Sequence, residues 1–108
     1  NKLAAALAAN ATTVKNALEA AVKNGLPVFV SECAGMEASG NGPLAPDEYQ
    51  KWLDVMENKV SWVNWSVSDK DETCSMILPR AKATGNWTDD LIKPWGKMVK
   101  QALKKYNR

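Results

Sequence analysis

The 108-residue sequence contains no histidine, only two cysteines and a single phenylalanine. The absence of histidine excludes the Ser-His-Asp and Cys-His mechanisms of hydrolases, and it excludes most zinc sites, which use imidazole ligands. Any chemistry that the chain performs must therefore rest on carboxylates, a thiol, a lysine or hydroxyl groups.

The sequence also lacks a strong charge of either sign and any long apolar run. Its formal net charge of +2 gives no reason to expect nucleic acid or a charged membrane surface as a partner. No apolar stretch approaches the length that crosses a bilayer, and the first residues do not follow the charged-then-apolar pattern of a signal peptide. Because the sequence begins with Asn1 instead of methionine, we expect a processed, truncated or partial product.

The spacing of apolar residues predicts alternating helices and strands. Helices are expected at residues 3–9, 13–24, 46–58 and 94–106, and strands at 27–32 and 60–67. Strands separated by a helix favour parallel pairing, and two strands alone leave both sheet edges open. A long polar loop follows each strand and a shorter link follows each helix, which is typical of a (β/α) barrel with functional loops at the carboxyl ends of its strands.

The two later helices each carry an apolar stripe at helical spacing, which predicts the side that packs inward. The residues expected to face inward are Tyr49, Trp52, Leu53 and Met56 in the first of these helices and Trp95, Met98, Val99, Ala102 and Leu103 in the second. Gly25 is a suitable stop for the helix before the first strand, and Pro46 is a suitable first residue for the helix after it.

A carboxylate ends the first predicted strand, Val-Phe-Val-Ser-Glu. Strand alternation puts Val28, Val30 and Glu32 on one face, and Phe29 and Ser31 on the other. In a barrel the first face would point to the interior and the second to the helices, so Glu32 would lie at the mouth. On this feature alone, a carboxylate that only caps a loop is an equally good interpretation.

The second predicted strand leads into a run of aromatic and charged residues. Sugar rings present C–H faces that stack on an indole, and their hydroxyls need the donors and acceptors that Lys70 and Glu72 supply. The alternative is that Trp62 and Trp65 are core residues beside solvated charges. We adopt this alternative for Trp62 but not for Trp65, because the polar run follows Trp65 directly.

Three segments carry a resemblance to a known family: Val28–Glu32, Ala38–Gly42, and Ser61–Lys70 with Glu72 two residues later. In this order and at this spacing they resemble the last third of a cellulase of glycoside hydrolase family 5, and the similarity covers about residues 25–95. The resemblance implies an α/β fold, namely the C-terminal fragment of a (β/α)8 TIM barrel. Residues 1–108 would then be a partial barrel containing strands seven and eight with their flanking helices, while residues 1–11 match no family motif.

The resemblance also implies roles for individual residues. Glu32 would be the nucleophile of a retaining endo-β-1,4-glucanase that hydrolyses cellulose or a related β-glucan, and Trp65 would line the sugar site beside the cleaved bond. Lys70 and Glu72 would bind the more distant non-reducing-end sugars, and Ala38 would touch the same region. A cis peptide bond is expected after Trp65. No metal or organic cofactor is implied, and a secreted, extracellular, bacterial-type enzyme is expected.

The sequence departs from the family pattern in two ways. The general acid of the family lies in an Asn-Glu pair, and no such dipeptide occurs here, so we expect the 108-residue chain alone to lack cellulase activity. Cys33 replaces the aromatic residue that usually follows the nucleophile. By the resemblance, the loops of Cys33 and Cys74 are neighbours, which favours a disulfide in a secreted enzyme; two free thiols are the alternative.

Two other functions remain open at this point. The chain could be a non-catalytic, self-associating barrel fragment with no turnover of its own. We expect its open sheet edges to be covered by self-association or by pairing with the missing N-terminal part of the barrel. A small carbohydrate-binding domain fits less well, because such modules are usually β-sandwiches and this pattern is α/β.

Overall fold

The computed structural model describes residues 11–57 and 59–107, so the helix expected at residues 3–9 lies outside the described residues. The elements, in chain order, are α2 (Ala11–Lys23), β1 (Phe29–Cys33), α3 (Pro46–Met56), β2 (Ser61–Asn64), the 3-10 turn η1 (Asp89–Leu91) and α4 (Pro94–Tyr106). The expected alternation of helices and strands is confirmed. None of the helices in the described ranges has the length and apolar character needed to span a membrane.

The ends of the helices follow local sequence signals. Gly25 adopts a positive φ of 78°, its N–H donates to the carbonyl of Val22, and the N–H of Leu26 donates to that of Ala21. This is the Schellman arrangement, in which a left-handed glycine satisfies the last carbonyls of a helix, so Gly25 ends α2 as predicted. Pro46 begins α3 and Pro94 begins α4, where the missing proline N–H has no helical acceptor to lose.

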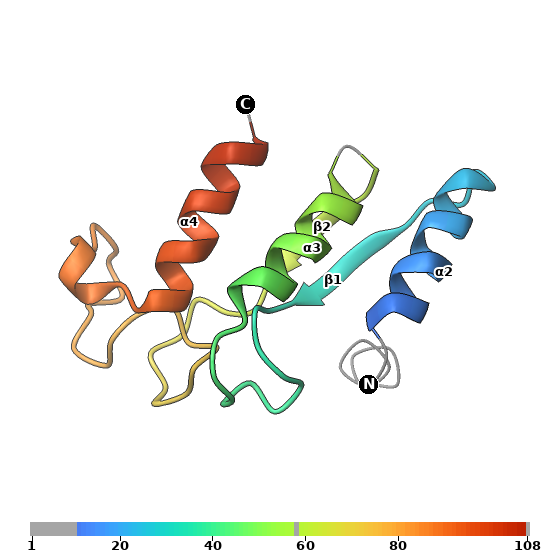
Figure 1. The fold of residues 1–108 in the computed structure, drawn as a ribbon. Coiled ribbons are helices and arrows are strands. Elements are labelled where there is room, and N and C mark those ends of the chain that lie inside the picture. The colour runs from blue at the N-terminus through green and yellow to red at the C-terminus, as the bar shows by residue number, and fades with distance from the viewer. Residues whose placement is uncertain (1–10, 58, 108) are drawn as a thin grey trace.

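The two strands form a parallel pair with an irregular register. Val30 lies opposite Trp62 and Cys33 lies opposite Asn64, so β1 has two residues where β2 has only Val63. The extra residue is a β-bulge at residues 31 and 32. All three helices lie on one side of this sheet (Figure 1), and no element of the described ranges covers the other side, which we call the open face.

The core lies between the sheet and the helices. It is formed by Tyr49, Leu53, Met56, Val60, Met76, Trp95, Val99 and Ala102. The inward positions predicted for α3 and α4 are therefore largely confirmed, with Trp52 and Met98 packed at the margin of the core. The prediction for Leu103 is wrong: its side chain is 46% exposed, because it follows Ala102 by one residue and so points about 100° away from the buried stripe.

The predicted faces of β1 are also wrong. Val28 and Val30 pack against the core on the helix side, whereas Phe29 is 60% exposed on the open face. The bulge then shifts the alternation by one residue, so Cys33 continues the helix side and Glu32 is exposed. Glu32 is therefore exposed because of the bulge; with regular alternation its side chain would lie on the helix side with Val28 and Val30.

Candidate functional site

An open pocket of about 460 Å³ lies where β1 and β2 end. It is lined by Glu32, Cys33, Ala34, Gly35, Met36, Glu37, Ala38, Ser39, Gly40, Ala45, Glu48, Tyr49, Trp52, Trp65, Glu72 and Cys74. Of the residues predicted to contact sugar, Glu32, Ala38, Trp65 and Glu72 therefore share one pocket. Lys70 is exposed and does not line it.

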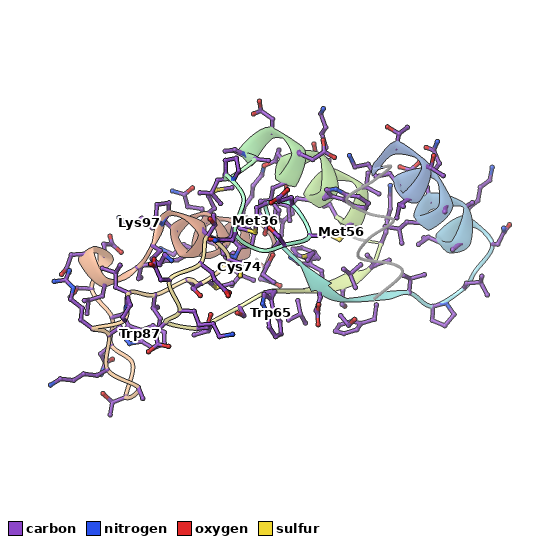
Figure 2. All side chains as sticks on the ribbon, turned by 90° about the horizontal axis from the view of Figure 1, so that it is seen from below. Met36, Met56, Trp65, Cys74, Trp87 and Lys97 are labelled. Carbon is purple, nitrogen blue, oxygen red and sulfur yellow. The ribbon has the colours of Figure 1, made fainter. Side chains whose placement is uncertain are left out.

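Trp65 is presented to solvent immediately beyond the second strand. Its side chain is 53% exposed, and Figure 2 shows it on the side of the sheet away from the helices. Its backbone N–H donates to the carbonyl of Cys33 at 2.8 Å, which ties it to the residue after Glu32. The Trp65–Ser66 peptide bond is cis, as predicted. The interpretation of Trp62 as a core residue agrees with its packing against the core cluster.

Trp95 of α4 is hydrogen-bonded to the backbone of Trp65. Its indole Nε1 donates to the Trp65 carbonyl at 2.7 Å. Its ring is completely buried and makes an edge-to-face contact with Tyr49, with the ring centres 4.8 Å apart. A side chain at Gly35 would place its Cβ 2.8 Å from the Trp95 ring, so the loop after β1 can close on Trp95 only with glycine there. The helical pattern identifies Trp95 as buried but gives no signal for this hydrogen bond.

The loops that follow the two strands are joined to each other. The N–H of Cys74 donates to the Gly40 carbonyl at 2.9 Å, and the N–H of Thr73 donates to the side-chain oxygen of Asn41 at 3.3 Å. A chain of part-buried hydroxyl groups supports the second loop, because Ser68 hydrogen-bonds both Ser66 at 3.0 Å and Ser75 at 2.8 Å. These contacts bring the loops that carry Ala38 and Glu72 to the same pocket.

Four carboxylates line the pocket, and three of them are hydrogen-bonded. Glu37 accepts from the Ser39 hydroxyl at 2.7 Å, and Glu72 accepts from the Cys74 thiol. Glu48 accepts from Lys15 at 2.7 Å, and this hydrogen bond holds the pKa of Glu48 below its usual range. Within residues 11–57 and 59–107, the Glu32 carboxylate has no hydrogen-bond or ion-pair partner, so it is the one free to meet a ligand.

The described part of the chain contains no cluster of three or more histidine, cysteine, aspartate or glutamate side chains that could hold a metal ion. The arrangement that the pocket offers is an exposed carboxylate beside an exposed indole, with further polar groups on the adjoining loops. This combination suits a sugar, whose ring stacks on the indole and whose anomeric carbon is open to a nucleophile.

The expected disulfide is not formed, because Cys33 and Cys74 are both free thiols. The bulge turns Cys33 toward the helix side, where its thiol approaches the Val63 carbonyl at 3.3 Å and the Asn64 side chain at 3.4 Å. Cys74 instead lies under the first loop, against Gly40. Burial raises the pKa of Cys33 to about 12, and burial together with the Glu72 carboxylate raises the pKa of Cys74.

Comparison with known proteins gives one consistent result. Residues 4–71 match the family described as cellulase (glycosyl hydrolase family 5). Endoglucanase A of Evansella cellulosilytica is 37% identical over 92 residues, which are 84% of this chain and 19% of that protein. The chain thus spans about a fifth of the length of this relative.

Solved structures agree with the sequence match. A structure from Cytophaga hutchinsonii is 36% identical with a TM-score of 0.80, over 88% of this chain and 32% of that one. The catalytic domain of a Thermobifida fusca endoglucanase in complex with cellotetraose is 28% identical with a TM-score of 0.76, over 85% of this chain and 30% of that one.

Proposed function

Because this chain belongs to the cellulase family, glycosyl hydrolase family 5, we propose that it forms the nucleophile side and the non-reducing-end sugar subsites of a retaining endo-β-1,4-glucanase. The observation that carries this proposal is that Glu32 and Trp65 line the same open pocket at the carboxyl ends of two parallel strands. The proposed substrate is cellulose or a related β-glucan, and the proposed location is extracellular.

The family has a (β/α)8 barrel fold, and we assign β1 and β2 to its seventh and eighth strands. Two features support this assignment. The strands are parallel with all three helices on one side, as in a segment of a barrel wall. The open face carries the exposed apolar side chains of Phe29 and Val63, as expected of residues that would face a barrel interior.

In the proposed reaction the Glu32 carboxylate attacks the anomeric carbon and forms a glycosyl ester, while the bond from that carbon to the leaving sugar oxygen breaks. A second carboxyl group protonates the leaving oxygen, and later takes a proton from the water that cleaves the ester. We assign this role to none of Glu37, Glu48 and Glu72, because none of them lies in the Asn-Glu pair that carries the general acid of the family. We therefore expect the 108-residue chain alone not to hydrolyse carboxymethylcellulose.

The sugar-binding part of the proposal rests on the loops around Glu32. The exposed ring of Trp65 provides an apolar surface on which the pyranose beside the cleaved bond would stack. Glu72 and Ala38 line the same pocket and would meet the next sugars, while Lys70 would meet them from the exposed part of its loop. The Thermobifida fusca endoglucanase was solved with cellotetraose, which makes this oligosaccharide a suitable probe.

The nucleophile can be tested without the general acid. A fluorinated cellobioside with a dinitrophenyl leaving group departs without protonation, so only the attacking carboxylate is needed. We expect slow accumulation of one covalent adduct, seen by intact mass and located on Glu32 by peptide mapping. The Glu32→Gln variant should form none, and Glu37→Gln should label like the unmodified chain. An adduct on another carboxylate, or no adduct, would contradict the assignment.

A second candidate function is a self-associating fragment without turnover. It is favoured by the open face, where Phe29 and Val63 expose large apolar side chains on two strands whose outer edges are unpaired within the described ranges. Exposed edges and apolar faces promote pairing with another chain. The partner would be a second copy or the remainder of a barrel.

A further inference from the structure

We propose that Lys93 and Trp95, which flank Pro94 at the start of α4, are positioning residues for the glucan site. Their side-chain donors bind the backbone carbonyls of three residues of the loop after β2, and these are the same three residues whose side chains are proposed to contact sugar: Trp65, Lys70 and Glu72. The inference deepens the proposed function and rests on it for the identity of the ligand.

Lys93 holds the outer part of the loop. Its Nζ donates to the carbonyl of Glu72 and, at 3.4 Å, to that of Lys70. An ammonium group has three donors and binds acceptors more strongly than a neutral donor does. The single side chain of Lys93 can therefore bind both carbonyls at once. The backbone of Lys93 is itself fixed, because its N–H donates to Met76 at 2.8 Å and its carbonyl accepts from Lys97 at 3.0 Å.

Trp95 holds the inner end of the same loop through its hydrogen bond to the Trp65 carbonyl. Its ring is fully buried and packed against Tyr49 and Gly35, so the donor has little freedom to move. The peptide that carries the exposed Trp65 ring is thereby attached to the rigid part of the molecule. Because the Trp95 donor cannot move, it fixes the direction in which the Trp65 indole points.

The arrangement favours a positioning role over a purely structural one. The donors bind backbone carbonyls of the loop, so they do not occupy the side chains of Lys70, Glu72 and Trp65. A binding site is effective when the geometry of its contacting groups is fixed before the ligand arrives. Loss of either donor should therefore weaken sugar binding while the helices and the core stay intact.

The first test measures loop opening through Cys74, whose side chain is only 3% exposed and which lies two residues beyond Glu72. In a Cys33→Ser background, Cys74 is the only thiol, and its reaction with a disulfide reagent reports how often the loop opens. Loss of a charge-assisted hydrogen bond in Lys93→Met should speed this reaction about tenfold. Lys93→Arg keeps the donors and should stay close to the parent rate.

Lys97→Met is the matched control, because Lys97 lies on the exposed side of α4 one turn further on (Figure 2). It removes a lysine charge without touching the loop and should leave the Cys74 rate unchanged. If Lys93→Met reacts no faster than Lys97→Met, the positioning role of Lys93 is refuted. The far-ultraviolet spectrum of each variant checks that the helices are retained.

The second test measures cellotetraose binding by the same proteins. Lys93→Met should weaken it about tenfold by the same loss of a charged hydrogen bond, with recovery in Lys93→Arg. Trp95→Phe, which keeps a ring but loses the donor, should weaken it in the same direction. A looser loop with unchanged affinity would make Lys93 merely structural and overturn the proposal. If the parent chain binds no cellotetraose, the proposed function fails, and the thiol rates still decide whether the loop is held.

Discussion

Tyr49, Cys33 and Asn64 meet directly behind the exposed Glu32. The side-chain oxygen of Asn64 accepts the Tyr49 hydroxyl at 2.8 Å and the Cys33 thiol at 3.4 Å. These contacts bind the end of β2 to α3 and to the end of β1, so they fix the backbone from which Glu32 projects. An acceptor with two donors also tolerates the loss of one of them without being left unsatisfied.

Replacement of Tyr49 by phenylalanine should therefore have a moderate cost. It removes one part-buried hydrogen bond and keeps the ring against Trp95, so we expect the free energy of unfolding in urea to fall by about 1 kcal/mol. Tyr106→Phe is the control, because Tyr106 is less buried than Tyr49 and the loss of its hydroxyl, which accepts from Gln50, should cost less. Equal losses in the two variants would mean that the hydrogen bonds to Asn64 contribute no more to stability than the hydrogen bond between Tyr106 and Gln50.

The thiol of Cys33 should make stability depend on alkaline pH. Burial raises its pKa from 9.0 to about 12. Above pH 9 the unfolded chain loses the proton while the folded chain keeps it, so the unfolded state binds fewer protons and stability falls as pH rises toward 12. Urea midpoints between pH 8 and pH 11 should fall more steeply in the parent than in Cys33→Ser. Parallel curves would contradict this assignment.

At the scale of elements, α4 is closely fitted to the segment before it. A Cβ at Gly96 would lie 2.5 Å from the Met76 carbonyl and 2.8 Å from the Ile92 side chain. Ile77, the residue after Met76, forms an antiparallel bridge with Ile92, two residues before α4 begins. The close contact at Gly96 therefore fixes the position of α4, and with it the distance from Lys93 and Trp95 to the loop after β2.

Gly96→Ala should be destabilising, although alanine favours helices. Overpacking against backbone costs about 1–3 kcal/mol, which exceeds the gain of about 1 kcal/mol that alanine brings over glycine inside a helix. The expected result is a net fall in the urea midpoint. Gln101→Ala, on the exposed side of the same helix, should change it little. A midpoint raised by Gly96→Ala would show that the helix can move away.

Element boundaries were predictable where one residue determines them, as Gly25, Pro46 and Pro94 show. The end of β2 was not, because the strand pattern continues to Val67 while the chain leaves the sheet after Asn64. The bulge in β1 was also missed. It depends on the register with β2, and residues 31 and 32 include no glycine or other local sign of it.

At the scale of the whole molecule, the candidate site could be predicted only in outline. A parallel sheet with polar loops at its carboxyl edge follows from the order of elements, and it places Glu32 near Trp65. The contacts that join the loops do not follow, because Cys74 and Gly40 lie far apart in sequence and meet only through the fold. The free state of Cys33 has the same origin, since the bulge decides which way the thiol points.

The open face should drive association of the chain. Phe29 is 60% exposed there, and its burial against a partner would stabilise a complex by roughly 1.5 kcal/mol or more, equivalent to about tenfold in the dissociation constant. Sedimentation equilibrium should therefore show weaker association for Phe29→Ser. Leu103→Ser, on α4, removes an exposed apolar side chain elsewhere and should have no such effect. An equal effect of both changes would point to nonspecific attraction.

The central claim, that Glu32 and Trp65 form two sides of one glucan site, is tested most directly by nuclear magnetic resonance during titration with cellotetraose. The account predicts saturable shifts of the Trp65 indole and of the Glu32 and Glu72 amides, while the buried indole of Trp95 and the amides of α2 change little. Saturable shifts confined to other surfaces, or none at Trp65 and Glu32, would contradict it.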